Sequence, residues 1–182
     1  MFHYTFRYAI IIMIMLPFYL LSRRPWKRDS KREWALGIFV LSTLGVLALA
    51  LEGDYHSPVS MVRNAGWRLS TGYAINMTPF RTIRGFFRHS GIGSFMVNIV
   101  GNVVMFIPWG FGLPLLWKKR QSFFSAVLFS ALLPLFIETV QLFIHRSVDV
   151  DDLILNFMGG MIGACCYFFI RKKAAGIDRL AR

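Results

Sequence analysis

Carboxyl and carboxamide side chains interrupt the apolar stretches of this 182-residue sequence. Glu138 and Gln141 lie three positions apart, which places them on one helical face, and His145 extends that face by one turn. A carboxylate beside an amide can act as a general acid or base, or can hydrogen-bond a polar ligand. If such an apolar stretch crosses a membrane, an unpaired carboxylate in it costs about 2.5 to 3.5 kcal/mol near the centre of the bilayer. A partner for Glu138 is therefore expected.

A second polar set opens the last apolar stretch. Asp149, Asp152 and Asn156 form one stripe at helical spacing, which Gly159 and Gly163 continue. The carboxylates could do acid–base chemistry, or they could cap the start of a helix, where acidic residues are favoured. Oxygen ligands of this kind suit Mg²⁺ or Ca²⁺, but the ligand set is incomplete, so no metal site is predicted. The two glycines predict a helix-packing face.

A third polar pair, Asn98 and Asn102, lies four positions apart in another apolar stretch. Both amides could face the same site as the carboxylates. They could also bond neighbouring helices, an interaction worth about 1 kcal/mol or less in membranes.

The segment that follows Thr78 predicts a short helix with Thr78 as N-cap and Pro79 as its first residue. Its cations share one face and its apolar residues share an adjacent one, which is typical of a helix in the lipid headgroup layer. The cations could meet phosphate groups or the carboxylates, or could only anchor the loop. The cations are Arg81, Arg84 and Arg88, and the apolar residues are Phe80, Ile83 and Phe87.

Composition indicates which elements must hold these residues. The chain is 55% hydrophobic and 16% charged, with a mean hydropathy of +0.51, which excludes disorder and argues against an ordinary soluble domain. Its net charge of +12 would suit nucleic acid. The basic residues cluster at the ends of apolar runs of bilayer length, however, so a membrane protein is predicted. The predicted runs are residues 8–21, 34–51, 91–117, 121–144 and 153–170.

Basic residues also orient the predicted spans. If all five runs cross the bilayer, residues 22–33, 118–120 and 171–182 share one side and hold about twice as many Lys and Arg residues as the other side. Cytoplasmic loops carry this excess, so the C-terminus is predicted to be cytoplasmic and the three polar sets to lie toward the outer leaflet. Residues 8–21 predict an uncleaved anchor, because a signal peptide would have a more basic start and small residues at its cleavage site. The adjacent Cys165 and Cys166 predict buried packing.

Four motifs in order resemble the VanZ-like family of bacterial membrane proteins, over residues 76–164. The resemblance implies an integral membrane protein of the cell envelope, in a family named for a member that gives low-level resistance to the glycopeptide teicoplanin. The motifs are Asn76-x-x-Pro79-Phe80, Asn98-x-x-x-Asn102-x-x-x-Phe106-Ile107-Pro108-Trp109-Gly110, Glu138-x-x-Gln141 and Asp149-x-x-Asp152-x-x-x-Asn156-x-x-Gly159-Gly160.

The sequence thus predicts an all-α polytopic membrane protein of the bacterial plasma membrane, with about five transmembrane helices and an interfacial helix in the outer loop. It divides into an anchor with a basic loop (1–33), a VanZ-like membrane domain (34–170) and a basic cytoplasmic tail (171–182). The expected ligand-binding residues are Arg81, Asn98, Asn102, Glu138, Gln141, Asp149, Asp152 and Asn156.

Two functions remain open at this point. The first is a non-enzymatic envelope protein whose outward polar site binds a membrane lipid, a lipid-linked envelope component or a lipoglycopeptide. The second is an intramembrane enzyme acting on an envelope lipid or lipid-linked glycan, with Glu138 or Asp152 as acid or base and Arg81 against phosphate. Transport is not favoured, because the sequence has no evident inverted repeat. No cofactor and no nucleic-acid partner are expected.

Overall fold

The computed structural model describes residues 16–17, 19, 21–22, 30–53, 56–89, 91–144, 146–174 and 176–181. Most of the first predicted run, residues 8–21, lies outside these ranges, as does His145. The described chain is mainly helical, and four of its helical segments are long and apolar enough to cross a membrane: Lys31–Ala50, Ile92–Leu116, Phe123–Phe143 and Val150–Lys173. They correspond to the last four predicted runs.

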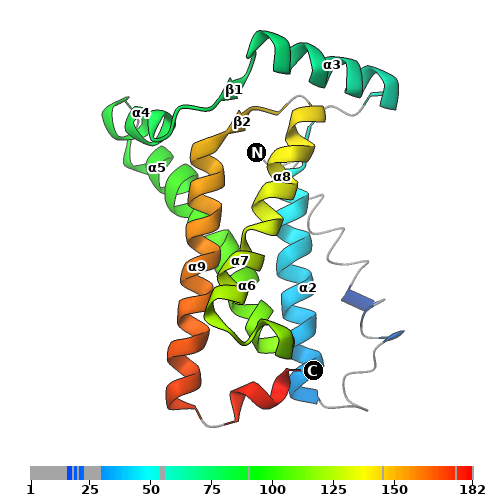
Figure 1. Ribbon diagram of the computed structural model, residues 1–182, viewed down its shortest axis with the longest axis vertical. Coiled ribbons are helices and arrows are strands. Elements are labelled where there is room, and N and C mark those ends of the chain that lie inside the picture. The colour runs from blue at the N-terminus through cyan, green and yellow to red at the C-terminus, as the bar shows by residue number, and fades with distance from the viewer. Residues whose placement is uncertain are drawn as a thin grey trace.

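These four segments stand side by side along the long axis of the molecule (Figure 1). The second and third segments are each assembled from shorter pieces in a row. In chain order the bundle consists of α2 (Ser30–Ala50), then α5 (Ile92–Phe95), the π-helical turn η2 (Met96–Val100) and α6 (Gly101–Leu116), then the 3₁₀ turn η3 (Lys118–Arg120), α7 (Phe123–Ser130) and α8 (Leu132–Phe143), then α9 (Val150–Lys173) and the 3₁₀ turn η4 (Ile177–Leu180).

Helices α6 and α9 pack so closely that only glycine fits where they cross. A Cβ atom on Gly159 would overlap the carbonyl oxygen of Val103, and one on Gly163 would overlap that of Ile107. The predicted packing role of these two glycines is confirmed. The close contact fixes the depth at which the polar residues of α9 face α6.

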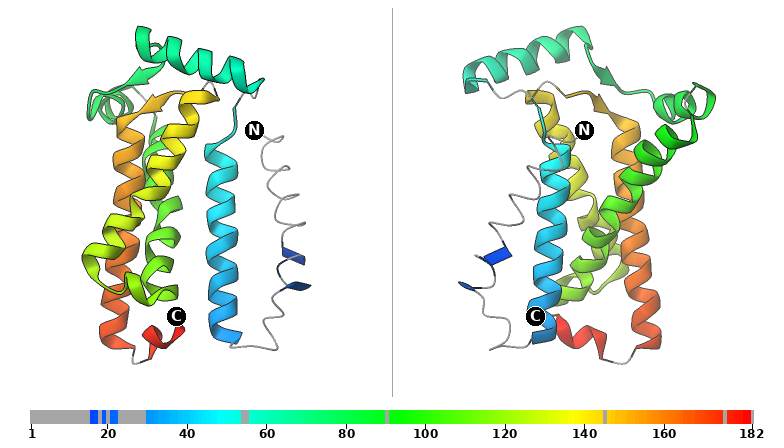
Figure 2. Two further views of the ribbon diagram at one scale, coloured as in Figure 1. Left: turned by 45° about the vertical axis from the view of Figure 1, so that its right-hand side comes forward. Right: turned by 180° about the vertical axis from the view of Figure 1, so that it is seen from behind.

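Proline explains why α7 and α8 are two helices. Pro134 has no N–H to donate to the carbonyl of Ser130, and the chain breaks at Ala131 between them. The freed carbonyl accepts a hydrogen bond at 3.2 Å from the indole N–H of Trp109 on α6. The Trp109 ring also stacks on Phe39 of α2, with centroids 5.2 Å apart, so one tryptophan links three segments of the bundle. Figure 2 shows α2 standing along one side of the other segments.

One end of the bundle is covered by residues 56–89 (Figure 1). Helix α3 (Pro58–Thr71) lies across this end, and α4 (Arg81–His89) lies beside the start of α9. Between them, β1 (Ile75–Asn76) pairs in parallel with β2 (Val148–Asp149), with Asn76 opposite Asp149. The two-residue strands therefore join the long loop to the connection between α8 and α9.

The predicted helix after Thr78 exists, but its predicted start is wrong. Helix α4 begins at Arg81, because Phe80 has a φ of 64°, which an α-helix does not accept. The oxygen of the Asn76 side chain accepts the Thr78 N–H at 3.1 Å, so the residues before Phe80 form a turn instead of a first helical turn.

Lysine and arginine mark the opposite end of the bundle. The turn η3 and the last turn of α9 both lie there, far from α3 and α4 (Figure 1). Cys165 and Cys166 point outward from α9 and are exposed, so the prediction that they are buried is wrong.

Candidate functional site

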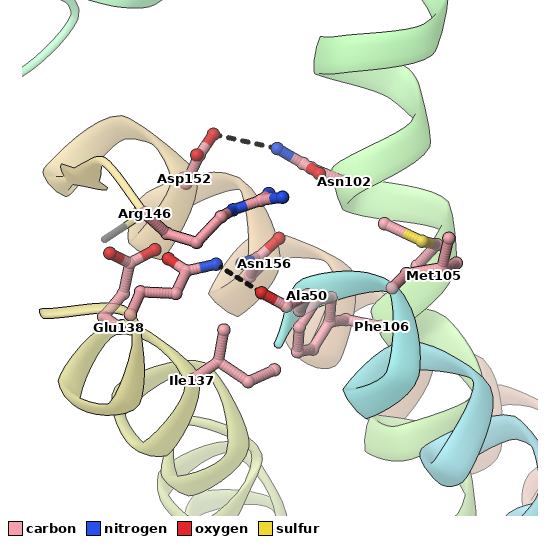
Figure 3. A pocket seen from close by; sticks show the side chains of 11 residues that line it. Ala50, Asn102, Met105, Phe106, Ile137, Glu138, Arg146, Asp152 and Asn156 are labelled. Carbon is pink, nitrogen blue, oxygen red and sulfur yellow. Dashed lines mark hydrogen bonds between the residues drawn. The ribbon is translucent and has the colours of Figure 1, made fainter. Parts of the chain in front are cut away.

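A pocket of about 100 Å³ lies where α2, α6, α8 and α9 meet, at the end of the bundle that α3 and α4 cover. Polar side chains form one side of it and apolar side chains the other (Figure 3). The pocket is lined by Leu49, Ala50, Asn102, Met105, Phe106, Ile137, Glu138, Gln141, Arg146, Asp152 and Asn156.

Two carboxylates face this pocket from different helices. Glu138 on α8 is buried, and its Oε2 atom accepts the backbone N–H of Asp149 at 3.2 Å. Asp152 on α9 accepts a hydrogen bond at 2.8 Å from the side-chain nitrogen of Asn102 on α6 (Figure 3). No Lys or Arg side chain in the described ranges forms an ion pair with either carboxylate. Both are therefore held by hydrogen bonds without a matching positive charge in contact.

Two amide oxygens in the same pocket lack a hydrogen-bond donor. Gln141 and Asn156 are each 6% exposed, and their Oε1 and Oδ1 atoms have no partner among the described residues. The nitrogen of Gln141 donates to the carbonyl of Ala50 at 2.9 Å. A carbonyl can only accept, so this bond fixes which end of the Gln141 amide faces the pocket. Unsatisfied buried acceptors are rare in native proteins and indicate a place where a ligand or water donates.

Arg146 is the one cation among the residues that line the pocket. Its side chain is exposed and extends across the polar side of the pocket (Figure 3). It also donates a hydrogen bond to the carbonyl of Glu52 at 3.3 Å. A guanidinium in this position can meet a ligand from the exposed side of the pocket while the carboxylates meet it from within.

Asp149 and Asp151 attach the loop before α4 to the start of α9. Asp149 is the N-cap of α9, which confirms the capping alternative, and its carboxylate also accepts hydrogen bonds from the side chains of Asn76 (2.9 Å) and Thr82 (2.5 Å). Asp151 is fully buried and accepts the backbone N–H groups of Phe80 (2.5 Å), Thr82 (2.7 Å) and Ile83 (3.1 Å). A carboxylate of α9 thus supplies the N-terminal cap of α4.

Arg68 of α3 attaches this helix to the end of the bundle at which the pocket lies. It is 1% exposed, and its guanidinium donates to the carbonyls of Leu142 (2.8 Å), Gln141 (3.1 Å), Ala74 (3.1 Å) and Arg146 (2.5 Å). Two of these carbonyls belong to the last turn of α8, where intrahelical donors run out. Arg68 therefore caps the C-terminal end of α8. It also connects α3 to the loop before β1, through Ala74, and to the loop before β2, through Arg146.

Burial lowers the pKa of the Arg68 guanidinium from its ordinary value, and Tyr73 opposes that shift. An arginine keeps its proton in spite of such a shift, so the side chain remains a charged donor. The charge-assisted bonds to carbonyls account for a buried cation that needs no carboxylate.

The structure brings together five of the eight expected ligand-binding residues: Asn102, Glu138, Gln141, Asp152 and Asn156 line the pocket. Asp149 stands behind them and donates its N–H to Glu138. Arg81 is exposed on α4 and Asn98 is exposed on η2, and neither lines this pocket.

The placement of Asn98 has a backbone cause. The turn η2 is π-helical, with the N–H of Gly101 bonded to the carbonyl of Met96, five residues earlier. A π-helical turn holds an extra residue, so positions four apart across it do not share a face as they do in an α-helix. Asn98 accordingly donates to the carbonyl of Ser94 at 2.8 Å, while Asn102 reaches Asp152.

Sequence reasoning did not single out Arg68, Arg146 or Asp151 as parts of this end. Arg68, Arg146 and Asp151 carried no clear signal in the sequence, since their roles depend on contacts between segments far apart in the chain.

Four apolar helical segments around a buried polar pocket at one end define the class: a polytopic α-helical membrane protein with a candidate ligand site. The sequence profile of the VanZ/LLP1 family matches residues 38–171, and the chain belongs to this family. It is 33% identical over 100 residues to Protein VanZ of Enterococcus faecium, a match that covers 54% of this chain and 55% of that protein. The chain thus matches about half the length of this curated relative. No solved structure matches the chain.

Proposed function

We propose that this protein is a non-enzymatic envelope protein of the bacterial plasma membrane that binds the headgroup of a membrane lipid or lipid-linked envelope component in the pocket around Glu138. One observation carries the proposal: carboxylates and unpaired amide oxygens line one side of a pocket whose other side is apolar. A small site with one polar and one apolar side suits an amphiphile, because an amphiphile has a polar headgroup joined to an apolar part.

The proposed orientation has the pocket facing outward and the C-terminus in the cytoplasm. The lysine- and arginine-rich segments Lys118–Arg120 and the end of α9 lie at one end of the bundle, and the pocket lies at the other. Cytoplasmic ends of transmembrane helices carry the excess of basic residues, which supports this orientation.

The helix α4 is proposed to lie in the outer headgroup layer. Phe87 is 70% exposed and Phe80 is 50% exposed, while Arg81, Arg84 and Arg88 are exposed as well. Exposed aromatic and basic residues on a short helix at the end of a membrane bundle are typical of an interfacial helix. Its arginines would then attract anionic lipid toward the pocket.

Low-level resistance to a glycopeptide such as teicoplanin is proposed as the physiological outcome, on the basis of the VanZ resemblance. An acylated glycopeptide is itself an amphiphile, so the same pocket could bind it or an envelope lipid that it depends on. The test compares the growth-inhibitory concentration of teicoplanin in cells that express wild-type protein, Glu138→Gln or Asn98→Leu. Protection that Glu138→Gln loses and Asn98→Leu keeps supports the role, while equal protection or none contradicts it.

Binding is tested by purifying the protein from native membranes and identifying retained lipids by mass spectrometry. Glu138→Gln keeps the shape and one acceptor oxygen but removes the charge, so it should lose a specific lipid that wild-type protein retains. Asn98→Leu is the matched control, because Asn98 is exposed and outside the pocket. Retention of the same bulk lipids by all three proteins would oppose the proposal.

An intramembrane enzyme is the second candidate function. The observation that favours it is the presence of Glu138 and Asp152 in one pocket on different helices, since two carboxylates in different surroundings can divide acid and base roles. It requires turnover of an envelope lipid or lipid-linked glycan by purified protein that Asp152→Asn abolishes. Absence of turnover over a broad lipid panel would refute it.

A further inference from the structure

The pocket offers more hydrogen-bond acceptors than the protein satisfies. The Oε1 atom of Gln141 and the Oδ1 atom of Asn156 are buried without a donor in the described chain, and both residues line the pocket. The Gln141 amide cannot turn over to relieve this, because its nitrogen is bonded to the carbonyl of Ala50. A group that fills the pocket must therefore bring N–H or O–H donors.

The pocket also carries an uncompensated negative charge when its ionisable groups are charged. Its lining includes two carboxylates, Glu138 and Asp152, and a single guanidinium, Arg146. Neither carboxylate forms an ion pair with a Lys or Arg of the described residues. Buried charges are normally paired, so one added positive charge would complete the site.

The size of the pocket limits what that cation can be. About 100 Å³ bounded by Ile137 and Phe106 leaves room for a compact group. The described residues contain no cluster of three or more His, Cys, Asp or Glu side chains suited to a metal ion, which argues against a divalent cation here. A primary ammonium is compact and brings three N–H donors, whereas a quaternary ammonium brings charge without any donor.

We infer that the pocket around Glu138 and Asp152 accepts a primary ammonium group, borne by an aminophospholipid of the ethanolamine type. The ammonium lies among the oxygens of Glu138, Asp152 and Asn156, and the adjoining phosphate lies toward the exposed guanidinium of Arg146. This inference rests on the proposed headgroup-binding function and names the headgroup. The apolar side of the pocket, with Met105 and Phe106, then meets the glycerol and the start of the acyl chains.

The test uses the full-length protein in phosphatidylglycerol vesicles that contain one test lipid at a fixed fraction. The test lipids are phosphatidylethanolamine, its N-methyl and N,N-dimethyl forms, and phosphatidylcholine, a series that removes N–H donors one at a time. After extraction in mild detergent, native mass spectrometry counts the lipids retained. Retention should fall stepwise, with phosphatidylethanolamine retained about tenfold more than phosphatidylcholine, the effect of losing one charge-assisted hydrogen bond or more.

Controls separate this inference from the proposed function. Glu138→Gln should remove the preference for phosphatidylethanolamine, and Thr139→Val, on the exposed face of the same helix, should keep it. Free phosphoethanolamine as competitor distinguishes the two sources of the same group: retained lipid in its presence assigns the site to a membrane lipid, and displaced lipid assigns it to a soluble amine as well. The methylation series uses wild-type protein, so it is decisive even if a variant fails to fold.

Equal retention of phosphatidylethanolamine and phosphatidylcholine overturns the inference. Retention of phosphatidylglycerol that depends on Glu138 overturns it too, but leaves the proposed lipid-binding function in place. If wild-type protein retains no lipid above the level of Glu138→Gln, both the inference and the proposed function fail.

Discussion

Asp151, in the first turn of α9, accepts the backbone N–H of Thr82 at 2.7 Å, although 69 positions separate the two residues in sequence. The same carboxylate accepts the N–H groups of Phe80 and Ile83. The last long helix of the bundle thereby caps a helix of the loop between α2 and α5. This contact determines where α4 lies with respect to the pocket.

Replacing Asp151 with alanine should loosen α4 while the bundle stays intact. Three backbone N–H groups lose their acceptor, so their exchange with solvent should become at least tenfold faster, which corresponds to about 1.4 kcal/mol or more of local stability. Hydrogen exchange read by mass spectrometry on peptides covering Phe80 to Ile83 measures the change. Asp152→Asn is the control, since its side chain bonds Asn102 instead, and equal protection in Asp151→Ala and wild-type protein would contradict the capping role.

Arg68 should be irreplaceable by lysine. Lysine keeps the charge but carries only three donors at a single point, so it cannot reach the carbonyls of α8, of Arg146 before β2 and of Ala74 before β1 together. Arg68→Lys is expected to lower the free energy of unfolding by about 2 kcal/mol or more, because buried carbonyls lose their donors. Thermal unfolding in detergent checks this, with Arg63→Lys, on the exposed face of α3, as the control. An unchanged midpoint for Arg68→Lys would refute the capping of α8.

The contact between α6 and α9 should not tolerate a single methyl group. Gly163→Ala sets a Cβ atom against the carbonyl of Ile107, which should lower the free energy of unfolding by about 1 to 3 kcal/mol. Gly45→Ala is the matched control, because nothing lies within 4 Å of a Cβ at that helical position. The thermal midpoint of Gly163→Ala should be clearly lower than that of Gly45→Ala. Similar midpoints would show that α6 and α9 can move apart without loss of stability.

The sequence was sufficient for the coarse fold because the bilayer allows few alternatives. Apolar runs of bilayer length predicted the four observed segments, and the stripe through Asp152, Asn156, Gly159 and Gly163 predicted which face of α9 is buried. Helical periodicity is local, so it can be read without the partner helix.

The parts of the site that depend on distant contacts could not be predicted in this way. Asn98 was predicted to share a face with Asn102 because α-helical spacing was assumed. The π-helical turn that separates the two residues is not visible in the sequence pattern. The loop helix was predicted to begin at Pro79 with Thr78 as its N-cap. It begins at Arg81 instead, because the cap of α4 comes from Asp151. The sequence pattern did not single out Arg68, although this side chain is 1% exposed and bonded to backbone carbonyls. For α4 and Arg68 a contact between distant segments decided the outcome, whereas for Asn98 a local change of helix type did.

The proposed orientation predicts different accessibility at the two ends. After Cys165 and Cys166 are replaced by serine, a single cysteine is introduced by Ser70→Cys on α3 or by Lys119→Cys in η3, both at exposed positions. A membrane-impermeant maleimide should label Ser70→Cys in spheroplasts and should label Lys119→Cys only after permeabilisation. The reverse pattern would place the pocket in the cytoplasm.

The central claim, that the pocket holds a specific lipid headgroup, is tested most directly by photo-crosslinking in living cells. A photoreactive phenylalanine analogue replaces Leu49, which lines the pocket and is 45% exposed, or Phe136, which is 52% exposed on α8 outside it. The account predicts that the Leu49 position captures one headgroup class and that Glu138→Gln abolishes this capture, while the Phe136 position captures bulk lipid in both backgrounds. Capture of the same mixed lipids at both positions, unaffected by Glu138→Gln, would contradict it.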